Sequence, residues 1–234
     1  MNAVEPRRSG PVSFWGQVRA IASHDLLVER RSGETWAIIT PFAAAALMTI
    51  PLAIGLNLTL ISSIGWPVFW STTLLFGMQI ALRHTSDERK SMRDLMTLLG
   101  IDPAARFTGR AVAGGVLLSG FMAVIGALTV FLYTPTALPD WPLLLVVGLL
   151  FAAGLSQLST LAADLTIGLG ARSSLAPLLV APLALPLLIG AARATDSLLR
   201  SGGILPWLMM LALADLLLAI VGVLTARPLE EATT

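Results

Sequence analysis

Polar side chains within the long apolar stretches are the residues of this sequence best placed to do chemistry. Asp164 lies about one turn before the end of one stretch, with Gln157 on the same helical face, and Asp215 lies near the middle of another. A charged Asp at the centre of a bilayer costs about 2.5–3.5 kcal/mol on insertion scales, so each carboxyl group must face protein, find a partner or be neutral. These residues predict either the lining of a transport path or polar contacts between helices.

The sequence contains no recognisable set of catalytic residues. His24 and His84 are far apart and have no second ligand nearby, which is typical of surface or interfacial residues rather than of haem or metal ligands. There is no H-E-x-x-H motif and no cysteine, so thiolate sites and c-type haem attachment are excluded. The only lysine, Lys90, follows Arg89, so a Walker A loop is absent. The chain is predicted to be non-catalytic, and any ATP hydrolysis must occur on another chain.

The elements that must position these residues are predicted to be transmembrane helices of an all-α integral membrane protein. Of the 234 residues, 56% are hydrophobic and 12% are charged, whereas soluble domains carry about 25% charged residues. Apolar runs of about 20 residues match a hydrocarbon core about 30 Å thick. We expect six spans, at residues 36–60, 66–82, 110–133, 141–168, 175–192 and 204–226. The fifth contains Pro177, Pro182 and Pro186, so it is expected to be kinked or interrupted.

The placement of Lys and Arg predicts the orientation of the spans. Of the 15 Lys and Arg residues, all except Arg193 and Arg200 fall on one side of a six-span arrangement. Because cytoplasmic connections are enriched in these residues, both termini are expected to be cytoplasmic in a bacterial inner membrane. Residues 1–35 and 227–234 then flank a transmembrane domain at 36–226. Tryptophans near the span starts are interpreted as interfacial anchors rather than as a haem-binding loop: Trp36, Trp66, Trp70, Trp141 and Trp207.

The segment before the first span, residues 12–31, is predicted to be an amphipathic helix. Its apolar residues recur at the spacing of one helical face: Phe14, Trp15, Val18, Ile21 and Ala22. This pattern is typical of a helix on the inner membrane surface. Such a helix anchors the chain, and it is compatible with docking of a cytoplasmic subunit. The charged residues assigned to docking are Asp25, Glu29, Arg30 and Arg31.

A second cytoplasmic element is predicted in the loop at residues 83–109. Thr85 and Glu88 fit a capping box, Gly100 fits a helix stop, and Asp102-Pro103 fits the start of the next helix. The helix between these signals has an apolar stripe and a charged face, made of Met92, Leu95, Met96 and Leu99 and of Asp87, Glu88, Arg89 and Arg93. A solvated connector is one interpretation. We favour the other, a helix that inserts into a groove of a partner protein.

Several stretches resemble the haem exporter protein B family of cytochrome c maturation systems. They are His24–Arg31 before the first span, Pro41-Phe42 and Pro51–Gly55 within it, and Leu165–Arg172 followed by Leu183–Ile189 around the fourth and fifth spans. The loop helix differs from that family in carrying Lys90–Asp94 in place of an Asp-Gly-Ser-Leu-Glu run. The ordered set extends over nearly the whole chain and, with six spans, is similar to an ABC-2-type permease half.

The resemblance implies a membrane permease subunit of an ABC transporter for haem delivery or export in c-type cytochrome biogenesis. It also implies an ABC ATPase subunit, a haem-handling membrane protein and a haem chaperone, with haem as cargo of the complex. Six spans are half the usual complement of an ABC transporter, so a second copy of the chain is expected in the bilayer. Nucleic acid is not an expected partner. On the residues alone two other readings stay open: an ABC-2 permease for a lipid, glycan or drug, and a non-transporting membrane scaffold.

Overall fold

A computed structural model of the chain describes residues 13–55, 57–86, 100–135, 140–168, 175–200 and 202–231, and every element within these ranges is an α-helix. In chain order the helices are α1 (Phe14–Ser32), α2 (Glu34–Ile54), α3 (Leu58–Ser86), α5 (Pro103–Tyr133), α6 (Trp141–Gly168), α7 (Leu175–Leu199) and α8 (Leu205–Glu231). The expected all-α class is confirmed for this part of the chain.

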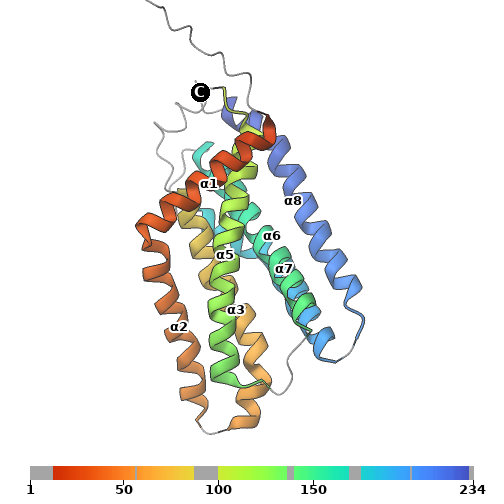
Figure 1. Cartoon of the computed structure of the whole chain (residues 1–234). Helices are drawn as coiled ribbons and strands as arrows, with labels where there is room; N and C mark the ends of the chain where they lie inside the picture. Colours follow the sequence, from red (N-terminus) through yellow and green to blue (C-terminus); the bar gives the residue numbers. More distant parts are fainter. Residues whose placement is uncertain are drawn as a thin grey trace, which may run out of the picture.

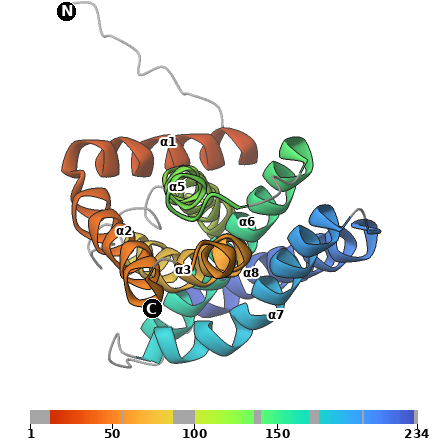
Figure 2. The same ribbon diagram turned by 90° about the horizontal axis from the view of Figure 1, so that it is seen from below.

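The longer helices form a bundle, and α1 crosses one end of it. Figure 1 shows α2, α3, α5, α6, α7 and α8 running alongside one another, with α1 at the end where α3, α6 and α8 finish and α5 begins. Seen from below, α1 lies along one side of the bundle next to α5 (Figure 2). The most connected helix is α5, which packs against α1, α2, α3, α6 and α8. The end that carries α1 is termed the α1 end.

Five helices among the described residues are long and apolar enough to cross a membrane. They are Trp36–Ile54, Leu58–His84, Pro103–Tyr133, Trp141–Leu165 and Leu205–Ala226. These five correspond in order to the first four predicted spans and the last one, while α7 is not among them. The outward side chains of α8 include Leu213, Leu216 and Leu217, all more than half exposed. An apolar outer surface of this kind suits contact with lipid rather than with water.

The turn between α2 and α3 lies earlier than predicted. The expected first span ran to Leu60, whereas α2 ends at Ile54 and α3 begins at Leu58. Gly55 has a φ of 73°, a conformation that glycine adopts without steric cost. The side-chain oxygen of Asn57 accepts a hydrogen bond from the N–H of Leu60 at 3.1 Å, as a helix N-cap does. The apolar residues on both sides of this short turn conceal it in the sequence.

The early start of α3 changes the role of two tryptophans. Trp66 and Trp70 are only 5% and 1% exposed, because they lie well inside a helix that begins at Leu58. The indole N–H of Trp70 donates a hydrogen bond to Thr195 Oγ1 at 2.9 Å, and its ring centroid lies 5.2 Å from that of Phe151. The interpretation as interfacial anchors is therefore wrong for these two residues, which belong to the core.

Despite its prolines, α7 is one continuous helix. It passes through Pro182 and Pro186, so of the two predicted outcomes, a kink or an interruption, the interruption is absent and the kink stays a prediction. The inward face of α7 is a stripe of buried residues, Val180, Ala184, Leu187, Ala191 and Ala194. Packing of this stripe against α3, α6 and α8 supports the helix where the prolines remove backbone hydrogen bonds.

A proline in α2 is compensated by a side chain of α5. Pro51 has no N–H, so the carbonyl of Leu47, one turn earlier, lacks its usual helical donor. The hydroxyl of Tyr133 donates a hydrogen bond to that carbonyl oxygen at 2.9 Å, and Tyr133 is fully buried. The last residue of α5 thereby fixes α2 at the end of the bundle opposite to α1.

Candidate functional site

A short apolar stripe holds α1 against α5. Val18, Ile21 and Ala22 are buried. The two helices approach so closely that a Cβ at Gly109 would lie 2.9 Å from Ile21 Cβ, and any larger residue there would force them apart. The predicted amphipathic helix is confirmed as a helix. Its packed stripe is narrower than predicted, however, because Trp15 is 71% exposed.

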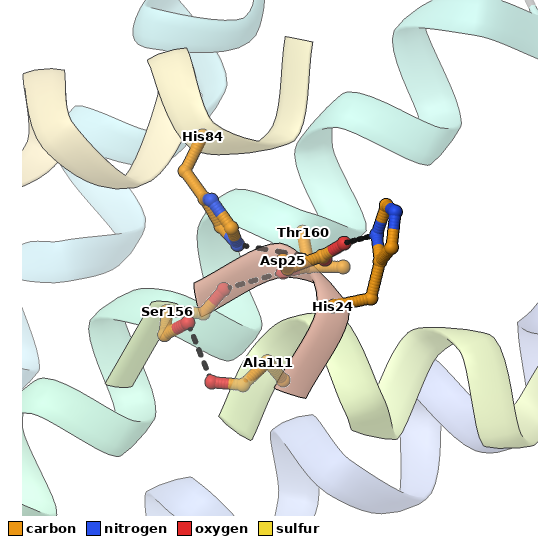
Figure 3. Close-up of polar contacts among 6 residues, drawn as sticks. All are labelled: His24, Asp25, His84, Ala111, Ser156 and Thr160. Carbon is orange, nitrogen blue, oxygen red and sulfur yellow. Dashed lines mark hydrogen bonds and ion pairs between the residues drawn. The ribbon is translucent and has the colours of Figure 1, made fainter. Parts of the chain in front are cut away.

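On its inward side α1 contacts the chain on both sides of the connection between α3 and α5. Gln17 Oε1 accepts a hydrogen bond from the backbone N–H of Asp102 at 3.0 Å, just before α5 begins. About two turns further along α1, Asp25 Oδ2 lies 3.8 Å from His84 Nε2 in the last turn of α3 (Figure 3), an ion pair when the imidazole is protonated. Gln17, Asp25, His84, Asp102 and Gly109 are termed the α1 junction. One helix thus joins both sides of a connection whose residues 87–99 lie outside the described ranges.

Asp102 begins α5 as predicted. Its Oδ1 accepts a hydrogen bond from the N–H of Ala104 at 3.0 Å, and Pro103 occupies the first turn, where a proline costs no helical hydrogen bond. Its own N–H is bonded to Gln17, so one residue fixes both the start of α5 and the contact with α1. The predicted N-cap is confirmed. The third span, expected to begin at Arg110, therefore begins about two turns earlier.

The side chain of His84 packs against α5 at Gly114, next to Ser156 of α6. It is 7% exposed, and a Cβ at Gly114 would lie 3.6 Å from His84 Cδ2 and would collide with Ser156 Oγ. The Ser156 hydroxyl donates a hydrogen bond to the carbonyl of Ala111, and the Thr160 hydroxyl donates one to the carbonyl of Ser156, both at 2.8 Å (Figure 3). The α1 junction is therefore continuous with a polar layer between α5 and α6.

The charged residues predicted to dock a partner fall on two sides of α1. Asp25 belongs to the α1 junction, and Glu29 is buried and has an interaction partner. Arg30 and Arg31 are exposed. Asp25 therefore contributes to the seating of α1 through His84, whereas the two arginines face outward. A docking role for these residues stays a prediction.

Two buried arginines lie near the start of α5. Arg106 and Arg110 are 6% and 5% exposed, and each has an interaction partner. The sequence presents them only as positive charges of a loop, because nothing in their spacing indicates burial. Unpaired burial of a guanidinium is strongly destabilising. The α1 end therefore contains two guanidinium groups that are removed from water, rather than only solvated charges.

The predicted loop helix lies outside the described residues. This applies to every residue assigned to partner binding there: Asp87, Glu88, Arg89, Met92, Arg93, Leu95, Met96 and Leu99. The structure describes the chain on either side, ending with Ser86 in α3 and resuming at Gly100. Gly100 has a φ of 68°, as expected for a residue that terminates a helix.

The polar residues predicted inside the spans are distributed over α6 and α8. Gln157 and Asp164 are half-buried on α6, and Asp164 has an interaction partner. Asp215 is buried on α8 against α6, where a Cβ at Gly154 would collide with its Oδ1. Neither carboxyl oxygen of Asp215 has a hydrogen-bond partner among the described residues. The small and polar face of α6 is packed, as the helix-contact reading predicts: Ala152, Ser156, Ser159, Thr160 and Ala163 are buried.

Both histidines lie at the α1 end and share one carboxylate. His24 Nδ1 is 3.4 Å from Asp25 Oδ1, and His84 lies on the other oxygen (Figure 3). The prediction of surface or interfacial residues fits His24, which is exposed, but not His84, which is buried because α3 packs against α5. The available signal was that both fall on the same predicted side of the membrane. Across the described ranges, no group of three His, Cys, Asp or Glu residues is arranged to hold a metal ion.

The other half of the bundle contains an apolar cavity of about 260 Å³ between α3, α5 and α6. Its aromatic walls are Trp66, Phe69, Trp70 and Trp141, and its small residues are Ser119, Ala123, Gly126, Ala127 and Gly148. No charged side chain is among the residues that line it. Such a cavity accommodates apolar groups and supplies no acid, base or ligand for chemistry.

The apolar helices and their arrangement define a multi-pass α-helical membrane protein, with the Asp25–His84 contact and the buried Arg106 and Arg110 at the α1 end. The chain belongs to the CcmB family, since its sequence matches the family described as CcmB protein over residues 17–230. No curated protein matches the chain. Members of this family are membrane components of the haem-export ABC system for cytochrome c maturation, generally non-catalytic permease subunits that work with an ABC ATPase. The family resemblance of the sequence is confirmed.

Proposed function

We propose that this chain is an ABC-2-type permease subunit that couples ATP hydrolysis on a separate subunit to release of a haem-loaded chaperone in c-type cytochrome biogenesis. The family match supports the transport system, and the lack of a Walker A motif in the sequence supports hydrolysis on another chain. The observation that carries the coupling role is the α1 junction, because α1 contacts the end of α3 and the start of α5.

In this proposal α7 supplies a sixth span. Its 25 residues extend about 38 Å at about 1.5 Å per residue, enough to cross a hydrocarbon core about 30 Å thick. With six spans both termini lie on the α1 side, and the excess of Lys and Arg favours a cytoplasmic location for that side. A reporter fused after Thr234 is then expected to give a cytoplasmic signal, and a periplasmic signal contradicts the arrangement.

Two copies of the chain are proposed in the complex, beside a haem-handling membrane protein. Six spans are half the usual complement of an ABC transporter, and closed two-fold pairs are the commonest oligomers. Small residues such as Ala123 and Gly126 along the cavity are of the kind that lets a second helix approach closely. The mass of the complex in detergent tests the copy number, and one permease per complex contradicts it.

The ATPase is proposed to bind the loop at residues 87–99. ATP binding on a partner can move the spans only through a physically continuous element, and this loop is continuous with α3 and α5. The stripe of Met92, Leu95, Met96 and Leu99 is proposed to enter a groove of the ATPase, while the charged residues set its register. Apolar anchors of this kind usually supply most of the binding free energy of an interface.

Truncation of the anchors tests the proposed function. Leu95→Ala with Met96→Ala is expected to leave the protein inserted and to weaken ATPase binding at least about tenfold, or about 1.4 kcal/mol. Binding is measured by titration of the ATPase onto the purified chain, and the biological output as the yield of matured c-type cytochrome, which should fall with it.

The matched control is Leu216→Ala with Leu217→Ala, which truncates two exposed apolar side chains on the outer face of α8. This control should bind the ATPase normally. If the Leu95/Met96 variant also binds normally and supports full cytochrome maturation, the loop is a solvated connector and the coupling mechanism is wrong.

A further inference from the structure

We propose that α1 is a brace that holds the end of α3 and the start of α5 at a fixed relative position, with Gln17 and Asp25 as its positioning residues. The biological meaning of the brace rests on the proposed function, whereas its geometry rests on the α1 junction alone. An anchor helix on a membrane surface needs an apolar face and positive charge. It has no need of side-chain acceptors directed at two other helices.

Three contacts of the brace come from one face of α1. Gln17, Ile21 and Asp25 follow one another at intervals of four residues, the spacing of neighbours along a helix surface. Gln17 accepts from the N–H of Asp102 at 3.0 Å, Ile21 meets α5 at Gly109, and Asp25 lies 3.8 Å from His84 of α3. A single face of a stiff helix therefore reaches two helices, α3 and α5, that also pack directly against each other.

The contacts of the brace are largely buried, and this burial limits the movement of α1 relative to α3 and α5. The side chain of His84 is 7% exposed and that of Asp25 is 22% exposed, so water has little access to their contact. The Asp102 N–H lies in a partly buried position. Ile21 is itself buried against Gly109. The Asp102 N–H loses free energy when its acceptor on Gln17 is withdrawn, and the Asp25–His84 contact at 3.8 Å adds attraction when the imidazole is protonated, so α1 resists lifting away.

The brace determines how a displacement of the loop is transmitted. When α3 and α5 are held together through α1, force applied between them moves both helices and α1 as one body. When the brace is broken, α3 and α5 keep their own packing but lose the link through α1, so the same force displaces the end of α3 relative to the start of α5 more easily and part of the displacement is absorbed locally. Loss of the brace should therefore leave ATPase binding intact and reduce its effect on the spans. This phenotype is opposite to the one expected for the loop anchors.

The seating of α1 is measurable because the chain contains no cysteine. Ile21→Cys places a single thiol at the buried contact with Gly109, where it should react slowly with a water-soluble maleimide. Adding Gln17→Leu and Asp25→Asn, which remove the amide acceptor and the charge, should raise the labelling rate about tenfold as α1 lifts. Gln17→Glu with Asp25→Glu keeps both acceptors and should restore slow labelling. An exposed thiol from Ser23→Cys is the control and should label equally in all backgrounds.

The functional arm uses the full complex with its ATPase. Gln17→Leu with Asp25→Asn should bind the ATPase with unchanged affinity, while haem-loaded chaperone released per ATP hydrolysed falls about tenfold. Gln17→Glu with Asp25→Glu should recover that ratio. If Gln17→Leu with Asp25→Asn leaves the labelling rate at position 21 unchanged, the brace is overturned. The brace is also overturned if this variant loses as much ATPase binding as the Leu95/Met96 variant, because α1 would then be a docking element. If the wild-type chain binds no ATPase, the proposed function fails, and the labelling result still decides the brace.

Discussion

The α1 end and the cavity half of the bundle hold their helices together in different ways. At the α1 end, separate helices are joined by polar contacts such as Gln17–Asp102 and Asp25–His84. In the cavity half, aromatic rings and small residues surround an apolar space of about 260 Å³, and Trp70 in its wall bonds to Thr195 of α7, a helix that does not line the space. Directional contacts allow one arrangement, whereas apolar surfaces with free space allow several. The α1 end is therefore suited to transmit a displacement, and the cavity half is suited to accommodate it.

Three glycines, Gly109, Gly222 and Gly126, show the same contrast. At the α1 end, a Cβ at Gly109 would lie 2.9 Å from Ile21 Cβ, and one at Gly222 would collide with the ring of Phe107. In the cavity half, a Cβ at Gly126 would lie 3.5 Å from the ring of Phe69, an ordinary contact. Glycine permits helix contacts at the α1 end that no other residue allows. At Gly126 it leaves space unfilled.

The largest expected effect comes from exchanging a glycine for alanine in each region. Gly109→Ala should lower the free energy of unfolding by about 2 kcal/mol, because overpacking of α1 against α5 outweighs the gain in helix propensity. Gly126→Ala should raise it by about 0.5–1 kcal/mol, because only the propensity changes. Reversible unfolding in mixed micelles measures both. If both substitutions change the free energy of unfolding in the same direction, the two regions do not differ in how closely their helices pack.

A smaller effect tests whether the end opposite to α1 depends on a polar bond. Tyr133→Phe removes the donor to the Leu47 carbonyl and should cost about 1–1.5 kcal/mol, since the carbonyl is buried and lacks its helical donor. In a Pro51→Ala background the new backbone N–H serves Leu47, so the same substitution should cost less. The double-mutant cycle gives the coupling free energy. A coupling near zero would mean that the tyrosine stabilises α2 by packing alone.

The smallest effect concerns the polar layer beneath His84. Ser156→Ala deletes one hydrogen bond, to the carbonyl of Ala111, and leaves that carbonyl its helical donor. The expected cost is about 0.6 kcal/mol, the average for such bonds between membrane helices. Thr225→Ala is the matched control, because its hydroxyl bonds only within α8, to Val221 and Gly222, and it should be close to neutral. If Ser156→Ala costs more than about 2 kcal/mol, Ser156 supports the residues of the α1 junction as well as making its own hydrogen bond.

Local signals in the sequence predicted local structure well. The bounds of α6, Trp141–Gly168, agree with the fourth predicted span, and Asp102-Pro103 begins α5 as expected from capping chemistry. Both rest on residues adjacent in the chain. The turn at Gly55 was missed because apolar residues flank it on both sides, so hydropathy did not change where the backbone did.

The candidate site was only partly predictable. In a bilayer, apolar residues face both lipid and protein, so periodicity does not separate a core tryptophan such as Trp70 from a half-exposed one such as Trp141. The Asp25–His84 contact joins residues that become neighbours only when α1 and α3 both pack against α5. Each charge was visible in the sequence, whereas the pairing depends on helix positions that no local pattern specifies. The predicted topology placed Asp25 and His84 on one side of the membrane, and the sequence contains no further signal for their contact.

The corner between α1 and α2 has a consequence for synthesis of the chain. A single residue, Gly33, with a φ of 58°, separates the two helices. Gln17 and its partner Asp102 are 85 residues apart, so at about 5–20 residues per second the ribosome needs roughly 4–17 s to deliver the surface on which α1 finally rests. During that interval α1 exists without α5, and its exposed Trp15 and Leu27 suit a temporary position on the bilayer surface. The turn at Gly33 then lets α1 close onto α5 as the last of its contacts to form.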